Sequence, residues 1–149
     1  MTQLNGVNLP GLFGIANLLV RSVGSALVAA AGLSGVAEMM ASIGASIAVQ
    51  MVHLPIPKFD NFRDDTHKRE FITTGIACGF TVAFGAPLAG TLFAHEISKP
   101  NSFWNIKTVL QSLLSSVIAM GTFCSVTFLQ VFLYYKYENL PTDSYFYLT

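Results

Sequence analysis

Charged side chains are scarce in this sequence, and this scarcity limits what the chain can be. Only 11% of its 149 residues are charged, whereas 52% are hydrophobic. A soluble domain carries about 25% charged residues, so the chain lacks the charge that would keep it in water. Its formal net charge is zero, which leaves no overall field to attract nucleic acid. The composition therefore indicates a protein whose solvent is lipid, and it gives no support to nucleic-acid binding.

Residues typical of metal sites and enzymes are also few. The chain has two cysteines and three histidines, without the close, repeated spacing that zinc ligands need. It has no G-x-S-x-G motif for a hydrolase and no P-loop ending in Lys-Ser/Thr. We predict no metal, no cofactor and no enzymatic activity. Four serines in the last apolar segment are better explained as contacts between helices than as nucleophiles; they are Ser112, Ser115, Ser116 and Ser125.

The hydrophobic residues are gathered in segments of helical length. The predicted helices are 15–33, 36–52, 70–85, 87–97 and 105–134, with a polar loop at 53–69. A helix of about 20 residues crosses the hydrocarbon core of a bilayer, so we expect about three helices of full or nearly full depth. The two segments between 70 and 97 are each too short to cross alone. We predict one all-α, polytopic membrane domain over residues 1–149.

Charges and aromatic residues suggest how this domain is oriented. The loop is rich in basic residues, which favours the cytosolic side; they are Lys58, Arg63, Lys68 and Arg69. Aromatic residues flank the last helix, as at the two interfaces of a bilayer; they are Trp104, Tyr134, Tyr135 and Tyr137.

The apolar stretch between 70 and 97 is interrupted by Gly85, Ala86 and Pro87. Glycine is common just after a helix and proline at the first position of the next one, so the segment predicts two helices that double back on each other. Broken backbone at membrane depth survives only when it is buried in protein or lines a polar cavity. The alternative is one kinked helix that spans the membrane. Gly75 and Gly79 precede the break at a spacing that allows close helix contact.

Glu38 is an acidic residue inside an apolar segment, which makes it a candidate functional group. It follows a glycine-rich turn and lies near the predicted start of a helix. A helix N-terminus has unpaired N–H groups and partial positive charge, and it binds anions. The carboxylate could occupy such a site and give way to a permeant anion. Two other interpretations are equally open: Glu38 caps the helix, or it pairs with Arg21.

Several motifs in order resemble the CLC family of voltage-gated chloride channels and chloride/proton antiporters, particularly its intracellular, endolysosomal branch. The sequence "LNGVNLPG" is similar to that branch's "LNGVKIP". The run "FRDDTHKREFITTGIACGFTVAFGAPLAGTLFAHE", followed by "SFWN", is similar to its "FRRDTEKRDF…AGVSAAFGAP…G.LF..EE". The likeness covers nearly the whole chain but only most of the first of the family's two inverted repeats.

The resemblance implies that Glu38 matches the gating glutamate of the family, whose carboxylate competes with chloride, the transported ion. The residues matching the anion-binding turn are Ser34, Gly35, Val36, Ala37 and Glu38. The flanking glycines, lysine and proline of the family motif are absent here, and methionines follow the glutamate.

Further along, the resemblance implies a channel-like protein. Glu96 matches the first glutamate of a pair on the antiporters' proton route, and it remains as a remnant of that route. The second position is Ile97, which cannot carry a proton. The family relation also implies a homodimer, or association with a longer CLC-type subunit, in the membrane of an intracellular organelle. The alternative is a non-conducting membrane fragment that associates with a full-length relative.

Overall fold

The computed structural model describes residues 14–33, 35–53, 64–98 and 105–138. All regular structure in these ranges is helical, which confirms the all-α prediction. The helices are α1 (Ile15–Ala30), α2 (Val36–His53), α3 (Asp65–Phe84), α4 (Pro87–Ser98) and α5 (Ile106–Glu138).

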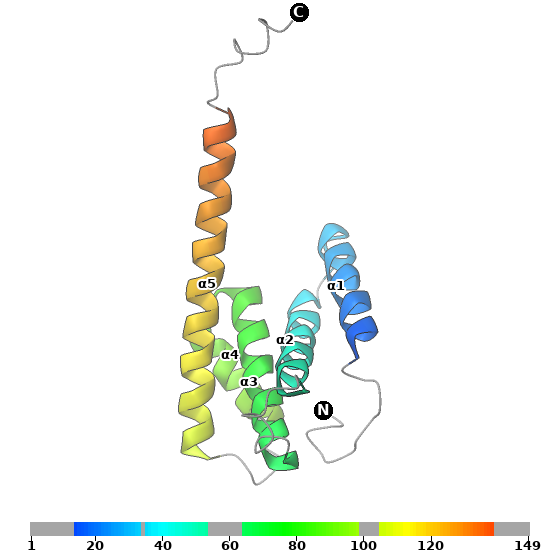
Figure 1. The fold of residues 1–149 in the computed structure, drawn as a ribbon, viewed down its shortest axis with the longest axis vertical. Coiled ribbons are helices and arrows are strands. Elements are labelled where there is room, and N and C mark those ends of the chain that lie inside the picture. Colours follow the sequence, from blue (N-terminus) through cyan, green and yellow to red (C-terminus); the bar gives the residue numbers. More distant parts are fainter. Residues whose placement is uncertain (1–13, 34, 54–63, 99–104, 139–149) are drawn as a thin grey trace, which may run out of the picture.

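The helices form a bundle from which α5 projects. Helix α3 packs against α2, α4 and α5, and α1 lies on the outer side of α2 (Figure 1). Helices α3 and α5 run in the same direction, while α2 and α4 run in the opposite one (Figure 1). The second half of α5 extends beyond the other helices, and every described side chain from residue 121 to residue 137 is exposed.

Helix α1 is shorter than predicted, because it ends at Ala30 rather than at residue 33. Gly32 adopts a left-handed conformation with φ of 67°. Its N–H donates to the Ala29 carbonyl at 3.1 Å, and the Leu33 N–H donates to the Val28 carbonyl at 3.1 Å. This pair of bonds is the Schellman motif, which closes a helix at a glycine. The 16 residues of α1 therefore measure about 24 Å.

Helix α3 begins at Asp65, five residues before the predicted start at residue 70. The polar stretch was expected to be loop, but Asp64 has an extended backbone and its carbonyl accepts the Lys68 N–H at 3.0 Å. A negative charge next to the first turn stabilises a helix through its dipole. The remainder of the predicted loop, 54–63, lies outside the described residues.

Among the described helices, α5 has the length and composition to cross a membrane, over Ile106–Tyr137. It continues to Glu138, beyond the predicted end at residue 134, so that Tyr135 and Tyr137 belong to the helix and do not follow it. The apolar helices Ile15–Ala30 and Val36–Val52 are shorter. The prediction of about three helices of full or nearly full depth stays a prediction for α1 and α2. Tyr134, Tyr135 and Tyr137 are exposed near the end of α5, while Trp104 lies outside the described residues.

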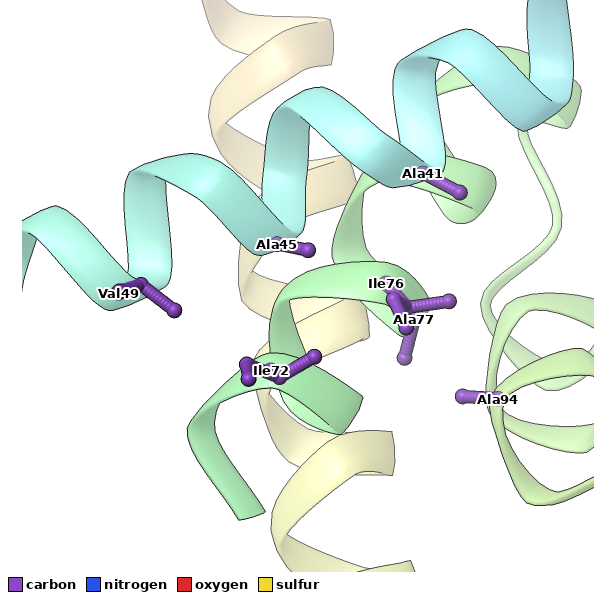
Figure 2. Close-up of a cluster of buried hydrophobic side chains, with 7 residues drawn as sticks. All are labelled: Ala41, Ala45, Val49, Ile72, Ile76, Ala77 and Ala94. Atoms are coloured by element: carbon purple, nitrogen blue, oxygen red, sulfur yellow. The ribbon is translucent and has the colours of Figure 1, made fainter. Parts of the chain in front are cut away.

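The interior consists mostly of small residues, and most of the large hydrophobic side chains lie outside. The buried cluster contains Ala41, Ala45, Val49, Ile72, Ile76, Ala77 and Ala94 (Figure 2). Many leucines are exposed instead; they include Leu19, Leu27, Leu88, Leu92, Leu110 and Leu114. In water this distribution would leave a large apolar surface, but helices in lipid associate through small residues and direct large ones outward. The packing therefore agrees with the membrane environment that the composition predicts.

Helices α2 and α3 approach so closely that their backbones touch. A Cβ built at Gly75 would overlap the Gly44 carbonyl, and one at Gly79 would overlap the Met40 carbonyl. A Cβ at Gly44 would in turn meet the Gly75 carbonyl. The close contact predicted for Gly75 and Gly79 is confirmed, and Gly44 is the partner on α2. Hydrogen atoms on these glycines face carbonyl oxygens, an arrangement typical of Cα–H···O contacts between helices.

Helices α3 and α4 form a hairpin, which confirms the predicted broken pair. Thr73, near the start of α3, and Ser98, at the end of α4, bring their hydroxyl oxygens to 3.2 Å. Near the turn, Gly90 packs against Ala77 and Thr81 of α3. The two helices are therefore antiparallel along their length, so the alternative of a single kinked helix is excluded.

Candidate functional site

The turn between α3 and α4 is built by the three residues that interrupt the apolar stretch. Gly85 has a φ of 67°, and its N–H donates to the Thr81 carbonyl at 2.7 Å. Pro87 is the first residue of α4, a position where the lack of an N–H costs nothing. The Gly90 N–H donates to the Ala86 carbonyl at 3.1 Å, which starts the hydrogen bonds of α4.

A second turn joins α1 to α2. Gly35 has a φ of 118°, a conformation that residues with a side chain rarely adopt. The Met39 N–H donates to the Gly35 carbonyl at 3.3 Å. Val36 and Ala37 are half-buried at the start of α2, and Glu38 is exposed in its first turn. Ser34 lies outside the described residues, so the predicted anion-binding turn is described from Gly35 onward.

The two turns lie at the same end of α3. Gly75 meets Gly44 and Ala45, and Gly79 meets Met40 and Ala41, so α2 runs antiparallel to α3. One further turn brings the start of α2 level with the end of α3, where the Gly85 turn begins α4. Helices α2 and α4 thus begin at one level on two sides of α3 (Figure 1).

Helix α5 shows how deep this level lies. A Cβ at Gly85 would be 3.5 Å from the Met120 Cε. Met120 is near the middle of the apolar span Ile106–Tyr137. If this span crosses a bilayer, the turns that start α2 and α4 lie near its midplane. Helices that begin at the midplane are typical of transporters, where their N-termini face anionic substrates.

The electrostatic potential at this level of the bundle depends on the ends of four helices. The first N–H groups of α2 and α4 carry partial positive charge, because the first turn of a helix has no backbone acceptors for them. The negative ends of α1 and α3 are partly satisfied, since carbonyls of Leu27, Val28, Ala29 and Thr81 accept bonds from the turns. The balance therefore favours an anion near the start of α2 or α4.

Glu38 is the one acidic residue in the first turn of α2. Among the described residues it forms no ion pair with Arg21. The physical reason is the antiparallel arrangement of α1 and α2, which places Arg21 two turns away from the connection and Glu38 next to it. The structure gives no support to the interpretation of Glu38 as a partner of Arg21. The first-turn position fits both a gating and a capping role, and the gating role stays a prediction.

Glu96 lies at the opposite end of α4, where its side chain is exposed. The next residue, Ile97, packs against the buried cluster of Ala and Ile side chains. A carboxylate at position 97 would therefore enter the bundle, whereas the one at position 96 does not. The assignment of Glu96 as a remnant of a proton route stays a prediction.

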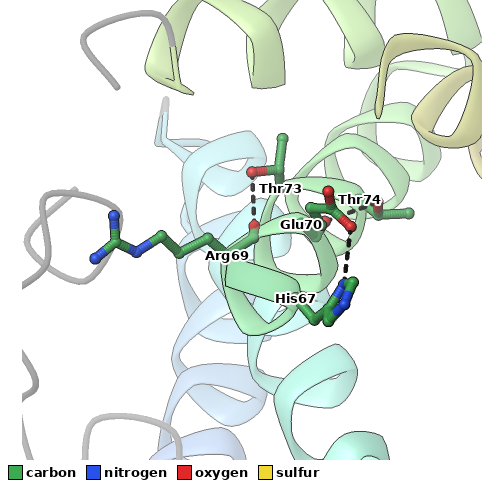
Figure 3. A network of polar contacts seen from close by, with 5 residues as sticks. All are labelled: His67, Arg69, Glu70, Thr73 and Thr74. Carbon is green, nitrogen blue, oxygen red and sulfur yellow. Dashed lines mark hydrogen bonds and ion pairs between the residues drawn. The ribbon is translucent and has the colours of Figure 1, made fainter. Parts of the chain in front are cut away.

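A polar network lies at the start of α3, on the side away from the turns. The His67 Nδ1 and a Glu70 carboxylate oxygen are 3.4 Å apart, and the Thr73 and Thr74 hydroxyls donate to the Arg69 and Glu70 carbonyls (Figure 3). The Arg69 side chain extends away from this network (Figure 3). These contacts stabilise the start of the helix and bring no further group to the candidate site.

Buried hydroxyl groups are the feature that sequence reasoning recovered only in part. Ser112 and Ser116 are buried on the packed face of α5, as predicted for contacts between helices, whereas Ser115 is half-buried and Ser125 is exposed. Thr73, Thr81, Thr108 and Ser98 are also buried and were not singled out. Thr108 precedes Ser112 and Ser116 at steps of four residues, and this spacing was the signal that could have found it.

The sequence profile of the voltage gated chloride channel family matches residues 1–148 of this chain. The chain belongs to this family. It is 32% identical over 127 residues to chloride channel protein D of Dictyostelium discoideum, and 33% identical over 127 residues to H(+)/Cl(-) exchange transporter 7 of Homo sapiens. Chloride channel protein C of Dictyostelium discoideum is 32% identical over 127 residues.

Each of these alignments covers 80% of this chain, but only 12% or 16% of the relative. The chain thus spans about an eighth to a sixth of the length of the relatives that it matches. The family consists of integral membrane proteins, named as chloride channels and exchangers, and the recognition of the CLC family from the sequence motifs is confirmed.

Proposed function

We propose that this chain takes part in chloride transport across a membrane, as a part of a CLC-type transport domain with Glu38 as its gate. The observation that carries the proposal is the start of α2 and α4 at one level of the bundle, with Glu38 in the first turn of α2. Chloride is the transported ion, and no cofactor is required. The family match supports chloride as the ion.

The gate works through competition for one positive helix end. The first-turn N–H groups of α2 attract an anion, and Gly35 to Ala37 provide the backbone nearest to it. When the Glu38 carboxylate occupies this place, chloride is excluded. When the exposed side chain swings away, or takes up a proton, chloride enters.

The transport is of the channel type. Coupled exchange needs a group that carries a proton on the inner side, and position 97, where the family has its second glutamate, is Ile97. Glu96 is exposed at the far end of α4 and does not replace it. Met39 and Met40 are half-buried just after Glu38, where they narrow the approach of an ion and slow its passage.

The pathway is completed by another subunit. Glu38 is exposed, so the described residues do not enclose its carboxylate. A second copy of the chain or a longer CLC-type subunit supplies the remaining wall, in the membrane of an intracellular organelle. The exposed leucines of α4 and α5, among them Leu92 and Leu114, provide an apolar surface for this association.

A second function is favoured by the short coverage of the relatives. Because the chain matches only 12–16% of their length, it could serve as a non-conducting membrane protein that binds a full-length relative and regulates it. The exposed apolar side chains of α5 suit such binding as well as they suit lipid.

Chloride efflux from liposomes tests the first function. The chain is reconstituted alone and together with a full-length relative, and flux is compared for the wild type, Glu38→Gln and the matched control Glu96→Gln. Transport with Glu38 as gate predicts that Glu38→Gln changes the flux at least several-fold, whereas Glu96→Gln leaves it unchanged. Equal effects of both substitutions would contradict the role of Glu38.

Co-purification distinguishes the two functions. A chain that conducts gives flux by itself or as a homodimer. A regulatory chain gives no flux alone, co-purifies with the relative and changes the relative's flux regardless of Glu38→Gln.

A further inference from the structure

Most buried hydroxyl groups in the described helices have a hydrogen-bond partner nearby. The Ser46 hydroxyl donates to the Ser42 carbonyl at 2.8 Å, that of Thr91 to the Leu88 carbonyl at 2.8 Å, and that of Ser112 to the Val109 carbonyl at 2.9 Å. A serine or threonine in a helix reaches such a carbonyl by simple rotation about χ1.

Three buried hydroxyls depart from this pattern, those of Thr81 on α3 and of Thr108 and Ser116 on α5. Thr81 and Ser116 have 0% of their surface exposed, and none of the three hydroxyl oxygens has a hydrogen-bond partner in the part of the chain that the structure describes. Leaving a buried hydroxyl unpaired costs its full desolvation. Two such groups in one interface therefore indicate that something else satisfies them.

The Thr81 and Ser116 hydroxyls belong to the same junction. Gly85, one turn after Thr81, faces the Met120 side chain, one turn after Ser116. Since α3 and α5 run in the same direction (Figure 1), one turn back along each helix leads to Thr81 and Ser116. Ser116 lies on the buried face of α5, four residues after the buried Ser112.

Helix α4 closes the third side of this junction. A Cβ at Gly90 would overlap the Thr81 Oγ1 and approach the Ala77 carbonyl oxygen to 2.5 Å. The Thr81 hydroxyl thus points toward the backbone of Gly90, and the Ala77 carbonyl offers a second acceptor at the same place. Ala77 of α3 and Ala94 of α4 are fully buried and belong to one cluster, so the buried side chains on this side of α3 include small, uncharged ones.

We propose that a water molecule is bound at the junction of α3, α4 and α5, bridging the Thr81 and Ser116 hydroxyls. Each hydroxyl both donates and accepts, and the Ala77 carbonyl has a lone pair left beyond its helical bond. These groups provide the two to four polar partners that a buried water needs. The guest is neutral and small, because its partners carry no charge and both hydroxyl-bearing residues are fully buried.

A double-mutant cycle tests the bridge in the full 149-residue chain, in detergent micelles. Thr81→Val and Ser116→Ala each remove one partner of the water, and we expect each to lower the unfolding midpoint by about 3 °C. The double variant should fall no further than the lower of the two, because the water is already lost. Thr81→Ser keeps the hydroxyl and should unfold close to the wild type. Ser125→Ala, on the exposed part of α5, is the matched control for the serine.

Every other result overturns the proposal. An increase in the midpoint would mean that the hydroxyls are truly unpaired, and no change would mean that they bond their own helices. An additive fall would mean that they act separately, and a fall in Thr81→Ser equal to that in Thr81→Val would indicate lost packing. A crystal structure of the wild type must also show a density peak between the two hydroxyls that is missing in Thr81→Val.

Discussion

The two faces of α3 are packed by different means. Toward α2, the contact is made by Gly44, Gly75 and Gly79, with backbone against backbone. Toward α4 and α5, the buried residues include hydroxyl groups such as Thr73, Thr81 and Ser116. Because lipid is as apolar as a leucine side chain, neither face gains from the hydrophobic effect, and each relies on close packing or on hydrogen bonds. The glycine face should not tolerate an added side chain, because backbone cannot move aside. The hydroxyl face should tolerate one better, because side chains there can change rotamer.

The largest effect is expected on the glycine face. A Cβ at Gly79 would overlap the Met40 carbonyl, which is backbone and cannot turn aside. Gly79→Ala should therefore reduce the free energy of unfolding by about 3 kcal/mol. The same substitution at Gly121 meets no atom within 4 Å and should stabilise the helix by about 0.5–1 kcal/mol. Steric trapping measures the free energy of unfolding of both variants. Equal effects of Gly79→Ala and Gly121→Ala would contradict the role of the close backbone contact.

The contact between α3 and α4 should give an intermediate loss. A Cβ at Gly90 would meet the Thr81 hydroxyl first and the Ala77 carbonyl second, so Gly90→Ala should cost about 2 kcal/mol. Because one of the two obstacles is a side chain, Thr81→Ala in the same protein should recover part of this loss. The free energy of unfolding of the single and double variants measures the recovery. No recovery would show that this face is as rigid as the glycine face.

The turn between these two helices depends on conformation rather than on space. Gly85 has a φ of 67°, and a Cβ there would only touch Met120 at ordinary contact distance. Gly85→Ala should cost about 1–2 kcal/mol from the left-handed backbone alone, and Gly85→Asn should cost less. Gly24→Ala in α1, where nothing lies within 4 Å, is the control. A loss in Gly85→Asn equal to that in Gly85→Ala would contradict this reason.

The smallest effect is expected for the hydrogen bond at the open end of the hairpin, where α3 begins and α4 ends. The Thr73 and Ser98 oxygens are 3.2 Å apart, and such bonds between helices in membranes contribute about 0.6 kcal/mol. A cycle of Thr73→Val and Ser98→Ala should give a coupling of this size. Thr74→Val paired with Ser98→Ala should give none, because the Thr74 hydroxyl donates to Glu70 of its own helix. A coupling near zero for Thr73 would mean that packing alone holds the hairpin.

Local signals in the sequence predicted what happens at Gly85 and Pro87, because glycine and proline act through their own backbone. They did not predict that α1 stops at Ala30, since Gly32 ends a helix only when its conformation becomes left-handed. The early start of α3 at Asp65 was missed because charged residues were taken as loop, although they also form exposed helix.

For the candidate site, the sequence identified Glu38 and the break, but not their relation. Nothing in the spacing of residues 38 and 85 indicates that their turns lie at one level. That relation follows from the contacts of Gly75 and Gly79 with α2, which determine the register of two antiparallel helices.

The sequence by itself determined the lipid environment, the helical class, the family and the pair of helices interrupted at Gly85 and Pro87. Each of these depends on composition or on short motifs. Only the tertiary structure decided which glycines meet, where the turns stand relative to α5, and which hydroxyls are buried without a partner of their own. The physical reason is that these properties belong to pairs of helices, and a pair of helices has a register and a distance that neither sequence segment contains.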